Sequence, residues 1–141
     1  TCAGMTAMTS SRTVLLILVT GLAILLPLLV GCRGWTMDYG NPAAQFEARD
    51  AAILAPDYLG RKVSVRGEVT TVETSDPARC TVRLQHGVVA DFGTFKAAAE
   101  ACPVGEIVHL DGIVRAVDVS GIILAPAFGR DPQALFDPLH P

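Results

Sequence analysis

Apolar and polar residues follow two different patterns along this chain, and the pattern changes near residue 32. From Thr13 to Val30 nearly every position is apolar, as in the core of a secretion signal or in a membrane-spanning helix. Beyond Gly60 the apolar positions alternate with polar ones, which is typical of strands that bury one face. The sequence therefore predicts an N-terminal apolar segment followed by a mainly β domain.

One alternating segment occurs twice, 45 residues apart. The copies run from Gly60 to Val69 and from Gly105 to Val114, and in both a turn glycine precedes alternating aliphatic residues. A second glycine, Gly67 or Gly112, takes an inward position in each copy. An inward glycine lets a strand bend sharply, as a strand must when it serves both halves of a small barrel. We expect the two copies to be barrel strands.

Shorter alternating runs predict three more strands. Residues 80–85 and 88–92 are joined by a tight turn at His86-Gly87. A further turn at 118–121 leads into the last strand, 122–124.

Two helices complete the domain. One is expected over 43–55, because Asn41-Pro42 has the residue types of a helix start. The other is expected over 95–101, with Thr94 as its N-cap. The order of elements after the first helix is that of an OB-fold, a five-stranded Greek-key barrel with a helix between strands 3 and 4. Its first and fourth strands are neighbours, which places the two glycine-containing copies side by side.

The apolar segment ends in Leu29-Val30-Gly31-Cys32. This ending resembles the bacterial lipobox, which implies that the Cys32 thiol receives diacylglycerol and that the leader is cut off before Cys32. Two or three acyl chains would then anchor the domain to a membrane. Because Arg33 follows the cysteine, the resemblance favours the outer membrane in bacteria that sort by that position. The alternative is an uncleaved helix, since eighteen apolar residues just suffice to span a bilayer.

These patterns divide the chain into four parts. We expect a lipoprotein signal at 1–31, a lipidated tether at 32–41, the OB domain at 42–126 and a Pro-rich tail at 127–141. In the tail, Leu135 and Phe136 could dock on the barrel; a floppy tail is the other possibility.

The strand segments also resemble a known family. Tyr58–Val69 together with Gly105–Val114 is similar to the tRNA-anticodon-like OB domain of bacterial lipoproteins and membrane-anchored proteins. The resemblance covers roughly residues 43–126 and implies an OB barrel. The family name reflects fold similarity and does not imply tRNA binding, and an export signal argues against tRNA as a ligand.

Charge and aromatic content argue against nucleic acid as the ligand. Beyond residue 31 the chain has ten Lys and Arg against fourteen Asp and Glu, whereas nucleic-acid binding normally needs a basic surface. OB faces that bind single strands also carry stacking aromatics. Here Phe92, Phe95 and Phe128 are expected in the core. Single-stranded nucleic acid remains an alternative that requires a shared groove for the basic residues Lys62, Arg66, Arg83 and Arg115.

The remaining candidates for chemistry are few. Cys80 and Cys102 could form a disulfide in an exported protein, or stay as two buried free thiols. The three histidines, His86, His109 and His140, do not cluster and are expected at the surface. With no nucleophile elbow, phosphate loop or paired catalytic carboxylates, we expect neither an enzyme nor a metal or cofactor site.

The sequence thus predicts a lipid-anchored, non-catalytic binding or scaffold module of the cell envelope. Its ligand would be a protein, a peptide or a saccharide, contacted by strands 2 and 3 of the barrel and by the loops 74–78 and 118–121. Two alternatives remain: a single-stranded nucleic-acid-binding domain, and a membrane-tethered assembly factor with an uncleaved N-terminal helix.

Overall fold

The computed structural model describes residues 40–141. The predicted signal and most of the tether, including Leu29, Val30, Gly31 and Cys32, lie outside the described residues. Residues Asn41–Pro141 form one compact unit. Within the described part of the chain, no helix has both the length and the apolar character needed to cross a membrane.

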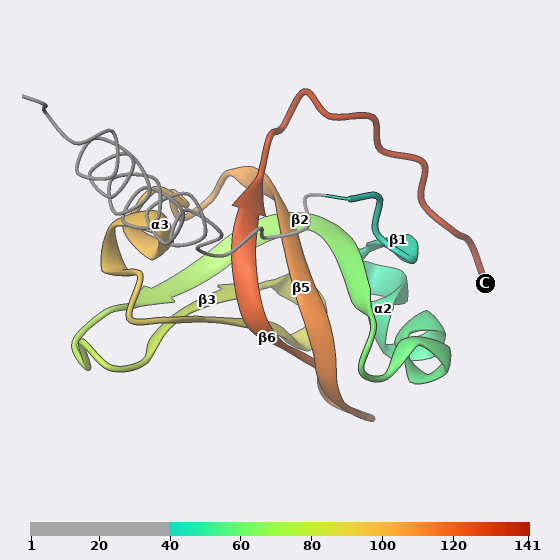
Figure 1. Cartoon of the computed structure of the whole chain (residues 1–141), viewed down its shortest axis with the longest axis horizontal. Helices are drawn as coiled ribbons and strands as arrows, with labels where there is room; N and C mark the ends of the chain where they lie inside the picture. The colour runs from blue at the N-terminus through green and yellow to red at the C-terminus, as the bar shows by residue number, and fades with distance from the viewer. Residues whose placement is uncertain (1–39) are drawn as a thin grey trace, which may run out of the picture. The chain divides into compact units, whose positions relative to one another are not determined.

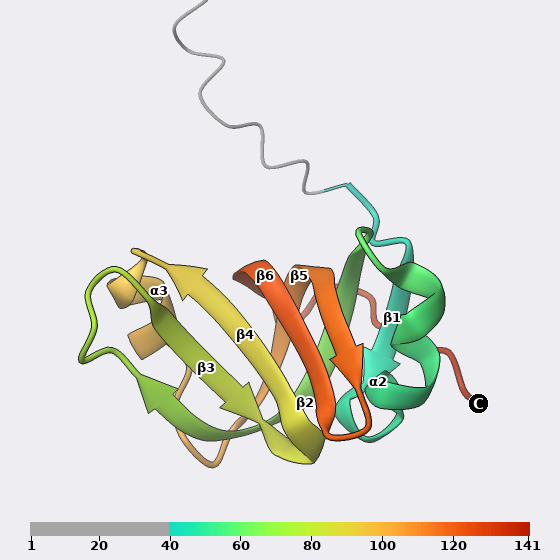
Figure 2. The same ribbon diagram turned by 90° about the horizontal axis from the view of Figure 1, so that it is seen from below.

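Five strands close into a barrel (Figures 1 and 2). They are β2 (Lys62–Glu73), β3 (Cys80–Leu84), β4 (Val88–Gly93), β5 (Ile107–Asp118) and β6 (Gly121–Arg130). The strand order is β2-β3-β4-β6-β5, and β5 pairs back onto β2, which closes the ring. β4 and β6 run parallel, whereas the other barrel pairs are antiparallel. With α3 (Lys96–Glu100) between β4 and β5, this is the OB topology, so the predicted fold class is confirmed.

The two copies of the glycine motif pair with each other in a reciprocal register. Gly67 of β2 lies opposite Val108 of β5, and Val63 of β2 lies opposite Gly112 of β5. Val65 pairs with Leu110 midway between them. Each glycine therefore faces an aliphatic residue of the other copy, as the neighbouring first and fourth strands of the fold require.

Both motif glycines are needed for close packing. A Cβ atom on Gly67 would lie 2.7 Å from the Cβ of Ala48, and one on Gly112 would lie 2.8 Å from the Cβ of Leu124. Contacts this short do not occur between carbon atoms in folded proteins. The prediction that these glycines point inward at crowded positions is confirmed.

The N-terminal helix is shorter than predicted. Residues Ala44–Glu47 form β1, which pairs parallel to β2, and only then do α2 (Ala48–Leu54) and the 3₁₀ turn η1 (Ala55–Tyr58) follow. Ala44 and Phe46 are buried whereas Gln45 and Glu47 are partly exposed, a period of two that the Ala-rich composition concealed. Pairing with β2 thus outweighs the local helix propensity.

The turns between strands agree with the sequence. In the 3₁₀ turn η2 (Gln85–Gly87), His86 and Gly87 have φ angles of 61° and 77°. At the β5–β6 turn, the Asp118 carboxylate accepts a hydrogen bond from the Ser120 N–H, with N and Oδ1 2.7 Å apart. The two turns touch, because a Cβ on Gly87 would lie 1.8 Å from the Ser120 carbonyl oxygen.

Two predicted boundaries were wrong. Thr94 does not cap α3 with its side chain; the N-cap is Phe95, and Thr94 only accepts a backbone bond from the Lys96 N–H at 2.9 Å. The last strand also ends later than predicted, because β6 continues to Arg130 and not to residue 124. Pro126 is tolerated because it lies at an irregularity in the β5–β6 register.

Candidate ligand-binding face

Four side chains form a continuous row across the outer face of four strands. Glu47 of β1 pairs with Arg66 of β2, Arg66 with His109 of β5, and His109 with Arg130 of β6. Successive residues of a strand point to opposite faces, and the chain neighbours of these four include the buried core residues Phe46, Val65 and Leu110. We call Glu47, Arg66, His109 and Arg130 the cross-strand row.

Both arginines of the cross-strand row have carboxylate partners. Arg66 holds Glu47 with two nitrogens: Nη2 bonds Oε1, and Nε lies 3.3 Å from Oε2. Arg130 Nη1 lies 3.3 Å from Asp111 Oδ2, and Lys62 Nζ approaches the same oxygen at 3.8 Å. The row therefore carries charges of both signs in fixed positions.

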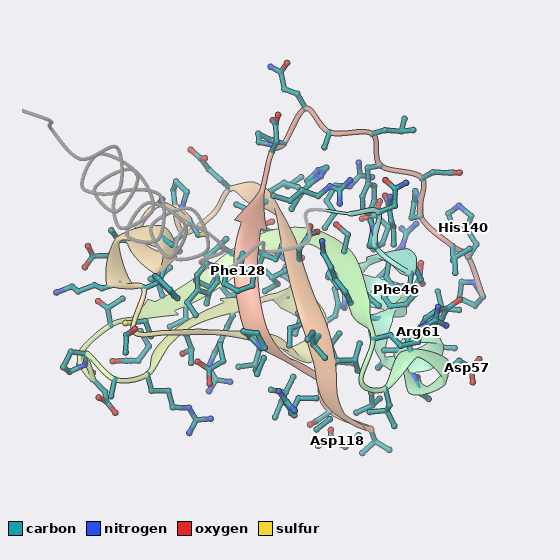
Figure 3. The ribbon with its side chains drawn as sticks, in the orientation of Figure 1. Phe46, Asp57, Arg61, Asp118, Phe128 and His140 are labelled. Carbon is teal, nitrogen blue, oxygen red and sulfur yellow. The ribbon has the colours of Figure 1, made fainter. Side chains whose placement is uncertain are left out.

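The C-terminal segment (residues 131–141) crosses this face (Figure 1). The ring of Phe136 stacks under the Arg66 guanidinium, 4.4 Å from its carbon, and lies 5.0 Å from the His109 ring. Leu139 then pairs with Phe46 at the edge of β1. Phe46 and His140 accordingly lie on the same side of the barrel in Figure 3, although they come from opposite ends of the described chain. Of the two alternatives left open for the tail, the structure shows docking, through Phe136, whereas Leu135 is 83% exposed.

One prediction of surface exposure was wrong at this face. His109 was expected at the surface, yet only 8% of it is exposed, and Asp111 and Ser64 beside it are buried as well. The burial of His109 could not be predicted from its own strand, because the Phe136 ring that packs on it comes from the C-terminal segment, which is remote in sequence. Three buried atoms have no hydrogen-bond partner among the described residues: Ser64 Oγ, His109 Nδ1 and Arg130 Nε.

The environment of His109 lowers the pKa of its imidazole below the ordinary value of 6.5. Burial is the largest cause, followed by the positive charges of Arg66 and Arg130. Glu47 and Asp111 act in the opposite direction but do not cancel these effects. His109 is therefore neutral near pH 7, and its unpartnered Nδ1 can donate or accept a hydrogen bond, according to tautomer.

A pocket of about 550 Å³ opens beside the cross-strand row. We call it the side pocket; it lies between the start of α2, the β2 and β5 strands, the turn η2 and the C-terminal segment. Its charged and polar lining residues include Glu47, Arg49, Arg66, Glu68, His86 and His109. Its lining contains no Ser, Thr or Cys and no Phe, Tyr or Trp. The side pocket thus offers fixed charges of both signs together with hydrogen-bond donors and acceptors, and its lining has no hydroxyl or thiol nucleophile.

The sequence predicts a different ligand-binding face, on the second and third strands of the barrel, which are β3 and β4. Arg83 of β3 is exposed there, and Arg79 pairs with Asp91 at 3.5 Å. The two predicted loops lie at opposite ends of β3: loop 74–78 comes before Cys80, whereas loop 118–121 packs on the turn η2 beyond Leu84.

The four basic residues of the nucleic-acid alternative do not share a groove. Lys62 and Arg66 lie in the half of β2 that pairs with β1, and both are bound to carboxylates. Arg83 lies on β3, and Arg115 of β5 donates a hydrogen bond to the Ala125 carbonyl at 3.0 Å.

The aromatic residues divide between core and surface. Phe92 is buried as predicted, but Phe95 is 51% exposed and Phe128 is half-buried, so those two predictions were wrong. Their rings meet edge to face with centroids 6.5 Å apart. Phe128 lies between β6 and α3 in Figure 3.

The remaining candidate residues do not form a site in the structure. Cys80 and Cys102 are buried free thiols, and burial raises the pKa of Cys102. His86 and His140 are exposed. Among residues 40–141, no three His, Cys, Asp or Glu side chains are grouped so that they could hold a metal ion.

Comparisons with known proteins find partial likenesses to solved structures. No protein-family model matches the sequence, and no curated protein matches it. One similar solved structure is a candidate nucleic acid-binding lipoprotein from Klebsiella pneumoniae, 25% identical, with a TM-score of 0.44 over 58% of this chain and 80% of that one. Another is a candidate aspartyl-tRNA synthetase from Leishmania major, 15% identical, with a TM-score of 0.43 over 68% of this chain and 22% of that one. The OB assignment rests on the strand order and register described above.

Proposed function

We propose that this chain is an exported, lipid-anchored binding module of the cell envelope, and that its ligand binds at the cross-strand row and the side pocket. The observation that carries the binding role is the His109 imidazole, which is nine-tenths buried, lines the side pocket and has an unpartnered Nδ1 among the described residues. A buried polar atom without a partner costs free energy, which a ligand with a matching group recovers.

The anchoring role is supported by the sequence around Cys32. The apolar run ends in Leu29-Val30-Gly31. Its last residue, Gly31, is small enough for a processing enzyme to approach the following cysteine. The compact unit that contains the barrel begins at Asn41, so in this proposal residues 33–40 connect the lipid to the barrel. Acyl chains contribute about 0.8 kcal/mol per buried methylene, so two or three of them hold a protein at a membrane.

Metabolic labelling with a palmitate analogue tests the anchor. Wild-type protein should incorporate the label, Cys32→Ser should not, and Cys80→Ala should label normally as the matched control. The inhibitor of lipoprotein signal peptidase, globomycin, should cause an unprocessed precursor to accumulate. Labelling that persists in Cys32→Ser disproves the lipid site. An unlabelled protein that keeps its leader would instead support the membrane-tethered assembly factor.

The walls of the side pocket favour a peptide over a saccharide. Charges of both signs, from Glu47, Arg66 and Glu68, match the mixed donors and acceptors of a peptide. Saccharides are commonly held against aromatic rings, and the lining has none. An envelope protein or peptide is therefore the ligand we propose.

We also propose that binding involves no catalysis. Both Glu47 oxygens are held by Arg66, which removes that carboxylate as a ready base. The side pocket has no hydroxyl or thiol side chain that His109 could activate. A nucleophile–base pair, the minimum for covalent catalysis, is therefore missing from the pocket lining.

A second candidate, single-stranded nucleic-acid binding, is favoured by one observation. Phe95 exposes half of its ring, and Lys96 follows it, so a base could stack there beside a cation. Fluorescence anisotropy with a single-stranded oligonucleotide at low and high salt separates the two functions. The binding module should bind no oligonucleotide at physiological salt. Affinity that falls steeply with salt and is lost in Phe95→Ala would establish the nucleic-acid function instead.

A further inference from the structure

We propose that the cross-strand row and the outer edge of β1 form a groove for an extended peptide, and that the chain's own C-terminal segment occupies this groove as a replaceable stand-in. The inference rests on the proposed function, because it names the ligand class of the same face. The ligand it predicts is a peptide with an aromatic residue followed three positions later by an aliphatic residue.

The edge of β1 is suited to accept another strand. β1 pairs with β2 along one edge, and among residues 40–141 its other edge has no strand partner beyond an isolated bridge between Phe46 and Leu139. The Leu139 N–H donates to the Gln45 carbonyl oxygen at 2.9 Å. The Asp137 N–H donates to the side-chain Oε1 of Gln45, also at 2.9 Å. Gln45 thus holds two backbone N–H groups of the C-terminal segment, one through its backbone carbonyl, as in peptide recognition by strand addition, and the other through its side chain.

One aromatic side chain fixes the register of the bound segment. Phe136 packs against both Arg66 and His109, so its ring contacts a guanidinium face and an imidazole at once. Leu139 follows three positions later and is 42% exposed. Leu135, next to the anchoring ring, contributes little because it is almost fully exposed. The groove therefore recognises an aromatic residue and a later aliphatic one, and it leaves the position before the ring free.

The C-terminal segment leaves three buried hydrogen-bonding atoms near the groove without a partner among the described residues. Ser64 Oγ, His109 Nδ1 and Arg130 Nε stay unpartnered among the described residues while the segment is in place. Pro132 and Pro138 have no N–H to offer. A peptide that supplies a donor or an acceptor at these atoms would bind more tightly per contact than the chain's own segment does.

The covalent link between the C-terminal segment and the barrel determines how strongly the segment competes with a free peptide. Because the segment follows directly on Arg130 of β6, its effective concentration at the groove is high, and a free peptide must displace it. Weakening the internal Phe136 contact should therefore increase the affinity for a peptide added in solution.

The test uses the full chain and a fluorescent peptide with the sequence of residues 131–141. The chain variants are Phe136→Ala and, as the matched control, Leu135→Ala, which removes a neighbouring but exposed side chain. Phe136→Ala should bind the peptide about tenfold more tightly than the wild type or Leu135→Ala does, as expected when an intramolecular competitor is weakened. A peptide with alanine at both anchor positions should not bind.

Two further measurements keep the proposal falsifiable. Adding Gln45→Ala to Phe136→Ala removes the side-chain Oε1 that accepts the Asp137 N–H and should weaken peptide binding again, whereas a double variant that binds equally well would contradict the proposed contact of the Gln45 side chain with the bound peptide. If Phe136→Ala stays folded by circular dichroism and binds neither peptide, the segment is a fixed part of the fold and the proposal fails. If the wild-type chain forms a dimer and the added peptide dissociates it, the occupant of the groove is a second copy of this chain and not a partner peptide. None of these results affects the Cys32 labelling, so failure here and failure of the anchor can be told apart.

Discussion

His109 of β5 lies directly opposite Arg66 of β2, and the ring of Phe136 packs on both. A residue that can become charged is thus enclosed between a permanent cation and an aromatic ring. The contact joins the barrel to the C-terminal segment, so the state of His109 and the position of the segment should depend on each other.

The first prediction concerns pH. The folded state lowers the pKa of His109 below its ordinary 6.5, so the unfolded chain binds the proton more readily. The stability that neutral His109 contributes is complete above pH 6.5 and is lost as the pH falls from there through the folded pKa. Urea unfolding between about pH 7.5 and about pH 5 should show this decline. It should be smaller in His109→Gln and unchanged in His140→Gln. Identical profiles for all three proteins would rule out His109 as the source.

The second prediction links the same histidine to the segment that covers it. Because burial is the largest cause of the lowered pKa, Phe136→Ala should raise the pKa of His109 toward its ordinary value. An NMR titration of the imidazole resonances measures this directly. Leu135→Ala, which removes an exposed side chain, should leave the titration as it is in the wild type. A Phe136→Ala chain with an unchanged titration would mean that the segment does not control access to His109.

The third prediction tests the crowded glycine of β2. In Gly67→Ala the new methyl group would lie 2.7 Å from the Ala48 Cβ, so β2 and α2 must separate. We expect a loss of about 1–3 kcal/mol in the free energy of unfolding, the usual cost of overpacking. Gly129→Ala in β6 is the matched control, since nothing lies within 4 Å of its added Cβ. Equal stability of the two variants in urea would contradict the inward packing of Gly67.

The fourth prediction concerns the thiols. Cys80 and Cys102 are buried and free, and burial raises the pKa of Cys102, so neither should react with iodoacetamide in the folded protein. In a Cys2→Ser/Cys32→Ser double variant, in which Cys80 and Cys102 are the remaining cysteines, mass spectrometry should find two alkylated thiols after unfolding in denaturant without a reductant. A mass without added groups would show a Cys80–Cys102 disulfide instead.

The barrel could be predicted from the sequence because its strands carry local signals. Alternation, turn glycines and the repeated motif of Gly67 and Gly112 all depend on residues close together in the chain. β1 escaped prediction because Ala44–Glu47 is rich in helix-forming residues, and only pairing with β2 makes it a strand.

The cross-strand row could be predicted only in part. The sequence predicts His109 at the surface, but the Phe136 ring that packs on it belongs to the C-terminal segment, and one contact that holds this segment joins Gln45 to a residue 92 positions away. A Pro-rich tail has no periodicity from which such docking could be inferred. The cross-strand row likewise needs the register of four strands, including β1, which composition concealed.

Site-specific photo-crosslinking in cells tests the central claim, that the ligand binds beside the cross-strand row. A benzophenone side chain at Ile107, which is exposed and lines the side pocket, is compared with one at Arg83, which is exposed on β3. We predict adducts from position 107 that protease destroys and nuclease does not, and few from position 83. Adducts from position 83 alone, or adducts that nuclease removes, would contradict this account.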